Sequence, residues 1–348
     1  MTRRRRILLL AMYDLREQRS GPTVRITNLH RALQQHLDVD LISGARGERR
    51  GATWRYLLSG RLRGVDGVYV ESSTALPSES DLAALLLARS LGHRVITYVR
   101  DAYQLFPDWY RADSPKRWLS AHAFRPAMRA LQAVSTSLAF PTRGLADAVA
   151  GPRRAALLLP PGAPPPTQVP RAPDARDLLF VGDLRTPEQG GALLIPAMAL
   201  ARQRGAEIGL IAVVRPGDEP AGKLPDWVRV ERATSSEIPG LLGTVLGTVI
   251  ARPPSAYADL ALPIKLGEYL SYGRPIVTTN RRETAAVVRH AGCGLVADDG
   301  IEGLSEAIRS LAVAPITQID AWSASAARAA VERSWDHVAR AIIAGLDA

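Results

Sequence analysis

The chain has 348 residues, of which 47% are hydrophobic and 22% are charged. At ~150 residues per domain this length predicts two domains, and the composition is that of ordinary globular proteins, so a small disulfide scaffold and a wholly disordered chain are excluded. The single cysteine, Cys293, excludes an intrachain disulfide and a zinc site with four thiolate ligands, and it favours a reducing, cytoplasmic location.

The net charge of +10 is unevenly distributed along the chain. Residues 1–158 carry 25 Lys and Arg against 13 Asp and Glu, a net charge of +12, whereas the remaining residues carry 19 against 21, a net charge of −2. This asymmetry predicts an anionic partner for the first half, which can be a membrane surface, a nucleic acid or a phosphorylated substrate.

Four arginines at 3–6 precede the apolar run Ile7–Met12, a pattern that superficially resembles a signal peptide. The run is far shorter than the ~20 residues of a membrane span, charged residues follow from Asp14, and no small-residue cleavage site is visible. The run is therefore predicted to be a first buried β-strand.

Short apolar runs alternate with amphipathic stretches along the first half, which is typical of βα units around a parallel sheet. Strands are expected at Ile7–Met12, Val39–Ser43, Val68–Glu71, Val95–Val99, Ala133–Phe140 and Ala156–Leu159, and helices at Thr23–His36, Ser80–Leu91, Pro115–Gln132 and Arg143–Val149. The prolines from Pro160 to Pro173 predict a linker, because proline lacks the backbone donor that helices and central strands need.

The same alternation restarts after the prolines. Strands are expected at Asp177–Gly182, Ile208–Val214, Val228–Glu231, Thr248–Ala251, Pro275–Thr278 and Gly294–Val296, and helices at Gln189–Arg204, Ser235–Leu242, Ile264–Tyr272, Arg282–His290 and Glu302–Leu311. The tail Ile319–Leu346 predicts a long amphipathic helix, broken once, with Trp322 and Trp335 as its large apolar anchors.

This order of elements predicts an α/β protein with two doubly wound, Rossmann-like domains that face each other across a cleft. The first domain is expected at 1–160, the linker at 161–174 and the second domain at 175–318, with the terminal helix at 319–348 packing back on the first domain. Strand ends and helix starts converge in such a cleft, so the active site is expected there.

The segment from Ala261 to Val277 is the most informative part of the sequence. Pro263 can open a helix with Lys265 in its first turn, and Glu268 lies three residues further on the same face. A lysine at a helix start attracts phosphate, and the carboxylate can accept two hydrogen bonds from a ribose diol. A surface ion pair between Lys265 and Glu268 is the alternative that spacing alone leaves open.

The run Pro263-Ile264-Lys265, followed by Glu268-Tyr269 and Gly273-Arg274-Pro275-Ile276-Val277, resembles the nucleotide-sugar motif of GT-B glycosyltransferases, specifically the retaining glycosyltransferase family 4 group. The resemblance extends to Phe180–Leu184 with Gln189-Gly190, to Gly292–Val296, and to the pair Arg100-Asp101. It implies a GT-B fold, with an acceptor-side domain first and a nucleotide-sugar domain second. It also implies a metal-independent transferase whose donor is a nucleoside-diphosphate sugar, most often a UDP-sugar or GDP-sugar.

The resemblance implies that Glu268 binds the nucleotide ribose and that Lys265 lies near the donor diphosphate. Many members have a glutamate eight positions before Glu268, where this chain has Leu260. Many also have an arginine after the strand glycine, here Gly182, and a lysine six residues later, where this chain has Asp183 and Gln189. Arg185 or Arg252 can supply the missing positive charge, and an ordinary solvated surface arginine is the alternative for each.

Two features of the first half are candidates for the same site. Gly21 lies between the first strand and the first helix, where a glycine lets backbone N–H groups approach a diphosphate, although an ordinary turn explains it as well. Arg100 is a candidate for substrate binding, and Asp101 for contacting the acceptor or the transferred sugar. A carboxylate that caps the next segment is the alternative for Asp101.

Other site classes lack support in the sequence. Asp38-Val39-Asp40 matches an Asp-x-Asp metal motif without supporting ligands, the histidines lack zinc-like spacing, and no Walker loop, nucleophile elbow or dinucleotide fingerprint is visible. We therefore expect no metal and no nucleic-acid partner.

Lys116-Arg117-Trp118-Leu119, with Arg125 and Arg129, predicts a basic amphipathic helix. Such a helix can contact an anionic membrane at which a lipid-linked acceptor is presented, or it can be an ordinary solvated face.

Taken with the resemblance, these features predict a cytoplasmic, hexosyltransferase-like glycosyltransferase, peripheral at the inner face of the membrane in the lipid-linked case. It would serve glycan or natural-product biosynthesis with a small-molecule, glycan or lipid-linked acceptor. The alternatives are an inactive GT-B partner subunit, suggested by Leu260, Asp183 and Gln189, and a related sugar-nucleotide epimerase.

Overall fold

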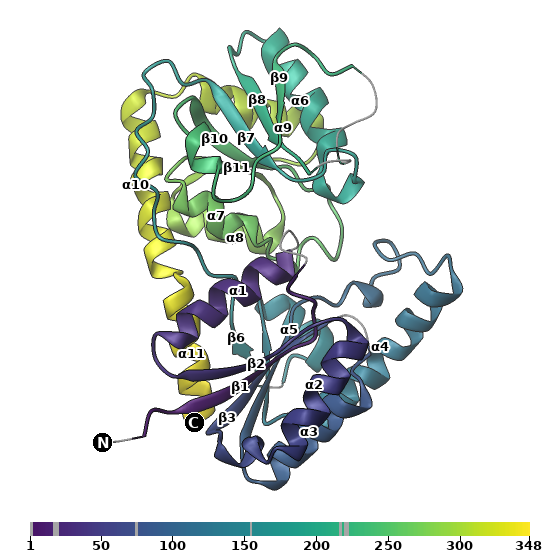
Figure 1. Ribbon diagram of the computed structural model, residues 1–348. Helices are drawn as coiled ribbons and strands as arrows, with labels where there is room; N and C mark the ends of the chain where they lie inside the picture. Colours follow the sequence, from purple (N-terminus) through teal and green to yellow (C-terminus); the bar gives the residue numbers. More distant parts are fainter. Residues whose placement is uncertain (1–2, 17–20, 74–75, 154, 216–217, 219–222) are drawn as a thin grey trace. The chain divides into compact units, whose positions relative to one another are not determined.

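The computed structural model describes residues 3–16, 21–73, 76–153, 155–215, 218 and 223–348. The chain divides into two compact units, Met1–Gly162 with Trp335–Ala348, and Ala163–Ser334 (Figure 1). The chain therefore passes between the units twice, once after Gly162 and once after Ser334.

Unit 1 is built on a six-stranded parallel sheet with the order β2-β1-β3-β4-β5-β6. The central strands are buried on both faces, as the apolar run of β1 requires, because helices cover a parallel sheet on each side. The strands are β1 (Arg6–Ala11), β2 (Asp38–Ile42), β3 (Gly67–Ser72), β4 (Arg94–Val99), β5 (Ser137–Phe140) and β6 (Leu157–Leu158).

The helices of unit 1 form two groups, one in which α1 packs on α11 and one in which α3 packs on both α2 and α4 (Figure 1). Ser78 caps α3 by accepting a hydrogen bond from the backbone of Asp81 at 3.2 Å. The helices are α1 (Gly21–Gln34), α2 (Arg46–Leu58), α3 (Glu79–Ser90), α4 (Pro115–Val134), α5 (Arg143–Ala150) and α11 (Trp335–Asp347).

A buried ion pair ties α1 to the sheet of unit 1. Arg25 Nε donates to Glu71 Oε1 at 2.9 Å, and both side chains are 1% exposed. The Tyr69 hydroxyl donates to the same carboxylate oxygen at 2.9 Å, and the guanidinium lies 3.7 Å from the centroid of the Tyr98 ring. These contacts replace the water that both charges lose on folding.

Unit 2 has a second six-stranded parallel sheet, with the order β12-β11-β10-β7-β8-β9. Side chains alternate along β7, so that Leu178 and Phe180 join a core with α6 and α9, whereas Leu179 joins a core with α7, α8 and α10. The elements are β7 (Asp177–Val181), α6 (Gly191–Gln203), β8 (Gly209–Val213), β9 (Val228–Glu231), β10 (Val245–Ile250), α7 (Lys265–Ser271), β11 (Ile276–Thr279), α8 (Arg282–Ala291), β12 (Gly294–Ala297), α9 (Gly300–Ala312) and α10 (Ile316–Glu332).

Two expected elements differ from the observed ones, and one observed helix was not expected. The strand expected from Ala133 begins at Ser137, because α4 continues to Val134. The helix expected at Ser235–Leu242 is reduced to one 3₁₀ turn at Ile238–Leu241, where a proline and a glycine disfavour further α-helix. The helix α2 was not expected, because its buried face includes Arg49, which pairs with Asp81 at 3.0 Å.

The tail forms two helices that belong to different units. In α10, Ile319 and Ala326 are buried in unit 2, and Trp322 packs partly buried against its core. In α11, Trp335 and Ile342 are buried in unit 1. Only Trp335–Ala348 therefore packs on the first unit, whereas 319–334 of the expected terminal helix lies in the second.

The proline-rich segment expected to link the domains at 161–174 is hydrogen bonded along unit 2. The backbone N–H of Ala163 donates to Arg333 O at 2.8 Å, and that of Thr167 donates to Ser271 O at 2.6 Å. Ala163 and Thr167 thus satisfy their backbone donors on other parts of unit 2. None of the helices in the described residues is long and apolar enough to cross a membrane.

Candidate functional site

The carboxyl edge of the unit 2 sheet brings together several residues that the sequence predicts for one site. Gly182 follows β7, Arg252 follows β10, and Lys265 begins α7. In open parallel sheets this edge is where ligands bind, because strand ends and the following loops converge there.

Lys265 is partly buried in this site and is held by two acceptors. Its Nζ donates to Val181 O and to Gln189 Oε1, both at 2.8 Å, and lies 5.1 Å from the centroid of the Phe180 ring. Burial and the positive charge of Arg252 lower the pKa of Lys265 to about 7, although Glu268 opposes the shift. The charge of Lys265 is therefore sensitive to an anionic ligand near neutral pH.

Two glycines allow the chain to approach Lys265 closely. Gly182 has φ +148°, and an added Cβ would lie 3.0 Å from Lys265 Nζ. Gly190 has φ +87°, and an added Cβ would lie 1.8 Å from Ala251 O. No other residue type fits at 190, so the turn before α6 is packed directly against the strand end that carries Arg252.

Glu268 and Tyr269 follow Lys265 on α7. Glu268 Oε1 accepts a hydrogen bond from Ser235 Oγ at 3.4 Å, and burial raises the pKa of this carboxyl group against the effects of Ser235 and Lys265. The Tyr269 hydroxyl accepts a hydrogen bond from Val181 N at 2.8 Å. The sequence analysis assigned no role to Tyr269 beyond its place in the motif. The structure shows that it connects α7 to the end of β7.

Arg185 is directed to neighbouring carboxylates. It forms an ion pair with Asp218 Oδ1 at 3.2 Å and lies 3.6 Å from Asp183 Oδ1. Burial acts to raise the pKa of Asp183, but hydrogen bonds from the Thr186 hydroxyl and the Arg185 amide lower it overall. Of the two arginines proposed to supply charge, Arg252 is the one whose charge acts on Lys265.

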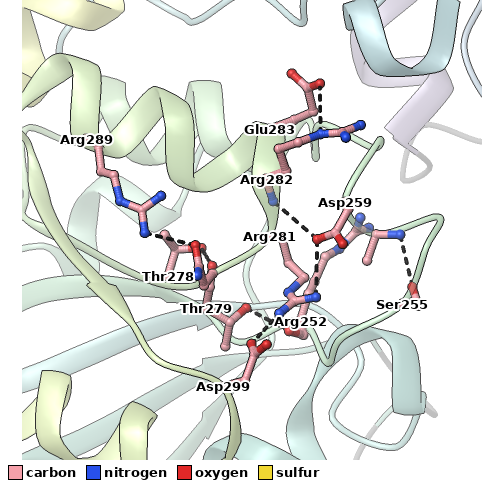
Figure 2. Close-up of polar contacts among 12 residues, drawn as sticks. Arg252, Ser255, Asp259, Thr278, Thr279, Arg281, Arg282, Glu283, Arg289 and Asp299 are labelled. Atoms are coloured by element: carbon pink, nitrogen blue, oxygen red, sulfur yellow. Dashed lines mark hydrogen bonds and ion pairs between the residues drawn. The ribbon is translucent and has the colours of Figure 1, made fainter. Parts of the chain in front are cut away.

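The loop between Arg252 and Lys265 is anchored to the start of α8 (Figure 2). The Thr279 hydroxyl donates to Arg252 O at 2.7 Å, and Asp259 Oδ1 accepts from Arg281 Nη1 and from the Arg282 backbone N–H, both at 3.2 Å. Arg281 is 3% exposed and also pairs with Asp299. These contacts hold the loop that connects the two cations.

The sequence did not single out Arg281 or Asp259. Leu260 occupies the position at which many members of the resembled family have a glutamate. Asp259 directly precedes it, so a carboxylate is present one residue away. The structure shows that this carboxylate is bonded to Arg281. No motif marks such a pair, because its members lie 22 positions apart.

The candidates of unit 1 lie at the start of α1 and after β4. Gly21 is the first residue of α1, and residues 17–20 of its expected turn lie outside the described residues. Arg100 and Asp101 follow β4 and form an ion pair with each other, and the Arg100 guanidinium lies 5.8 Å from the centroid of the Tyr13 ring. Within the part of the chain that the structure describes, no group of three or more His, Cys, Asp or Glu side chains is placed to hold a metal ion.

A comparison with known families finds one match, which lies within unit 2. Residues 175–313 match the family described as "Glycosyl transferases group 1". This part of unit 2 is similar to a glycosyltransferase group 1 domain. The match includes Gly182, Arg252, Lys265 and Glu268, so the motif at 263–277 predicted the domain type correctly.

Solved structures of glycosyltransferases resemble the whole chain. An α,α-trehalose-phosphate synthase from Burkholderia xenovorans has a TM-score of 0.63 at 11% identity, with 99% of this chain and 100% of that chain covered. Alr3699/HepE from Anabaena, in complex with UDP and glucose, has a TM-score of 0.63 at 15% identity and 99% coverage of both chains. WaaG, a glycosyltransferase of lipopolysaccharide biosynthesis, has a TM-score of 0.61 at 15% identity, covering 97% of this chain and 99% of that chain.

These structural similarities establish the fold. No curated protein sequence matches the chain. The two six-stranded parallel sheets with their covering helices confirm the predicted α/β class and its GT-B assignment.

Proposed function

We propose that the protein transfers a sugar from a nucleoside-diphosphate sugar to an acceptor, with retention of configuration and without a metal ion. The observation that carries the proposal is the placement of Lys265, held between Val181 O and Gln189 at the carboxyl edge of the sheet, one helical turn before Glu268. A cation and a carboxylate at this spacing can engage the diphosphate and the ribose of one donor.

Each residue has a distinct task in this proposal. Glu268 accepts hydrogen bonds from the two ribose hydroxyl groups. Lys265 and Arg252 stabilise the negative charge that develops on the leaving diphosphate, and such electrostatic stabilisation supplies most of the rate in reactions of this kind. Asp101, with Arg100, is assigned to the acceptor or the transferred sugar.

The donor is proposed to be a UDP-sugar or a GDP-sugar. Support for uridine comes from the structural neighbours, since Alr3699/HepE is in complex with UDP and glucose, and a trehalose-6-phosphate protein from E. coli is bound with UDP-2-fluoro glucose. The buried carboxylate of Glu268 and the Lys265 site fit the ribose and diphosphate that both donors share.

Titration of UDP and GDP, followed by kinetics with UDP-hexoses and GDP-hexoses, tests the proposal. Glu268→Gln removes the charge that strengthens the ribose hydrogen bonds, each worth ~1.5–3 kcal/mol, so nucleotide affinity should fall by about 10- to 100-fold. Lys265→Ala should lower turnover more than nucleotide binding, because its charge acts mainly on the leaving group.

Glu306→Gln is the matched control, because Glu306 pairs with Arg309 on the exposed face of α9. It should leave both affinity and turnover at parental values. Parental kinetics in the Glu268 and Lys265 variants would contradict the donor site. Nucleotide binding without transfer to any acceptor tested would instead identify an inactive partner subunit.

We also propose a lipid-linked acceptor, with the start of α4 in contact with an anionic membrane. Trp118 and Leu119 are 54% and 55% exposed, and Lys116 and Arg117 precede them. An exposed aromatic beside basic residues is typical of a membrane-interface helix. Arg117 also pairs with Asp113 at 3.0 Å, which reduces its contribution.

Binding to anionic and zwitterionic vesicles tests this surface. Neutralising Lys116, Arg117, Arg125 and Arg129 should reduce binding to the anionic vesicles. It should also lower the salt concentration at which this binding is lost. Equal binding by the variant and the parent would leave a soluble acceptor.

A further inference from the structure

The neutral side-chain amide of Gln189 contacts Lys265 in the proposed donor site. Gln189 Oε1 accepts a hydrogen bond from Lys265 Nζ at 2.8 Å, and Val181 O accepts another at 2.8 Å. A lysine ammonium has three N–H donors, so these two contacts leave one for a ligand.

The backbone holds Gln189 in this place. Gln189 ends a single 3₁₀ turn, Pro187–Gln189, and Gly190 follows with φ +87°. Gly190 packs so closely on Ala251 that a Cβ would overlap the carbonyl oxygen. On the other side, a Cβ on Gly182 would lie 3.1 Å from Gln189 Oε1. Gly182 therefore leaves the space in which the Lys265–Gln189 contact forms, and Gly190 allows the turn that carries Gln189 to pack on Ala251.

The charged groups that face Lys265 act in opposite directions. Arg252 at the end of β10 lowers the pKa of Lys265, Glu268 on α7 raises it, and burial lowers it, with a balance at about 7. Gln189 adds no charge, but its oxygen accepts from the ammonium form and so favours that form. A small change at position 189 should therefore change the protonation of Lys265 near neutral pH.

We infer that Gln189 is a positioning residue that holds the Lys265 ammonium group toward the diphosphate of the donor. The inference rests on the proposed function and names a residue that acts through Lys265. A lysine at 189 would place a second cation within hydrogen-bond distance of Lys265 and repel it, whereas a glutamate would neutralise it. The amide does neither, and its N–H groups remain able to donate to a phosphate oxygen.

The chain offers a direct measurement, because it has only three lysines, Lys116, Lys223 and Lys265. Their ¹³Cε signals can be followed by NMR over a pH titration of the full chain. In Gln189→Glu the new carboxylate should raise the pKa of Lys265 by about one to two pH units. In Gln189→Met the loss of the acceptor should lower it by about half a unit to one unit.

The signals of Lys116 and Lys223, which are exposed, should be the same in the parent and the variants at each pH, and circular dichroism checks that each variant is folded. Gln203→Glu, which makes the same charge change at the exposed end of α6, is the control and should leave Lys265 unchanged. The same Lys265 pKa in the parent, Gln189→Glu and Gln189→Met would overturn the inference.

Titration of the parent and variants with UDP and GDP separates this inference from the proposed function. Binding by the parent should weaken as the pH rises through the Lys265 pKa, because the ammonium group is lost. Gln189→Met should shift this weakening to lower pH and reduce affinity about 10-fold at neutral pH, and Gln189→Glu should shift it to higher pH. One outcome is that the Lys265 pKa is lowest in Gln189→Met and highest in Gln189→Glu, while neither nucleotide binds the parent. The proposed function then fails, but the positioning of Lys265 by Gln189 is supported. Nucleotide binding with an identical pH profile in all three proteins would overturn the inference alone.

Discussion

Removal of α11 should unfold unit 1, although the helix is the last element of the chain. Truncation after Ser334 removes Trp335, Val338, Ile342 and Leu346, whose exposed fractions are 7%, 3%, 0% and 4%. Burial of each aliphatic side chain contributes about 1.5–3 kcal/mol, and the tryptophan about 4–6 kcal/mol, so the total is about 10 kcal/mol. This loss equals the whole stability of a typical domain, about 5–15 kcal/mol.

Circular dichroism during urea and thermal unfolding measures the effect. The truncated chain should lose the cooperative transition of unit 1, and the graded variant Ile342→Ala should lose about 2–5 kcal/mol. Val331→Ala in α10 is the control, because Val331 is 61% exposed and its truncation should cost less than about 0.5 kcal/mol. A truncated protein that melts like the parent would refute the reasoning, since it would show that α11 does not complete the core of unit 1.

Two further outcomes are expected from substitution and unfolding experiments. Gly190→Ala should cost more than about 3 kcal/mol, because its Cβ would lie 1.8 Å from Ala251 O, whereas Gly205→Ala, with φ +91° and no atom within 4 Å of the added Cβ, should cost about 1–2 kcal/mol. Equal melting temperatures for these two variants would contradict the close packing at Gly190. Arg25→Met and Glu71→Gln should each cost about 3–5 kcal/mol by leaving a buried partner unsatisfied, and Arg25→Met/Glu71→Leu should cost less than their sum. Additive losses in urea unfolding would show that the two charges are not coupled.

The sequence by itself determined the α/β class and the order of most elements. Apolar runs such as Ile7–Met12 and Asp177–Gly182 correspond to β1 and β7, because a strand buried on both faces needs a continuous apolar run. The motif around Glu268 also predicted the similarity of residues 175–313 to the glycosyl transferases group 1 family. Its spacing placed Lys265 and Glu268 one turn apart on α7, a relation that a single helix fixes locally.

Other features were decided by contacts between distant residues. The polar helix α2 is stable because Arg49 meets Asp81, which lies 32 positions later. The helices α10 and α11 are both amphipathic and follow each other directly. Their sequences alone therefore do not predict which of the two units each helix packs on.

The candidate site itself depends on the tertiary structure. Gln189 contacts Lys265 across 76 positions, and Arg281 contacts Asp259 across 22. A sequence pattern records the residue types that a local element prefers, whereas the partner of a buried charge is chosen by the packing of the whole unit. Only the folded chain therefore decides which polar groups replace the water that each buried charge has lost.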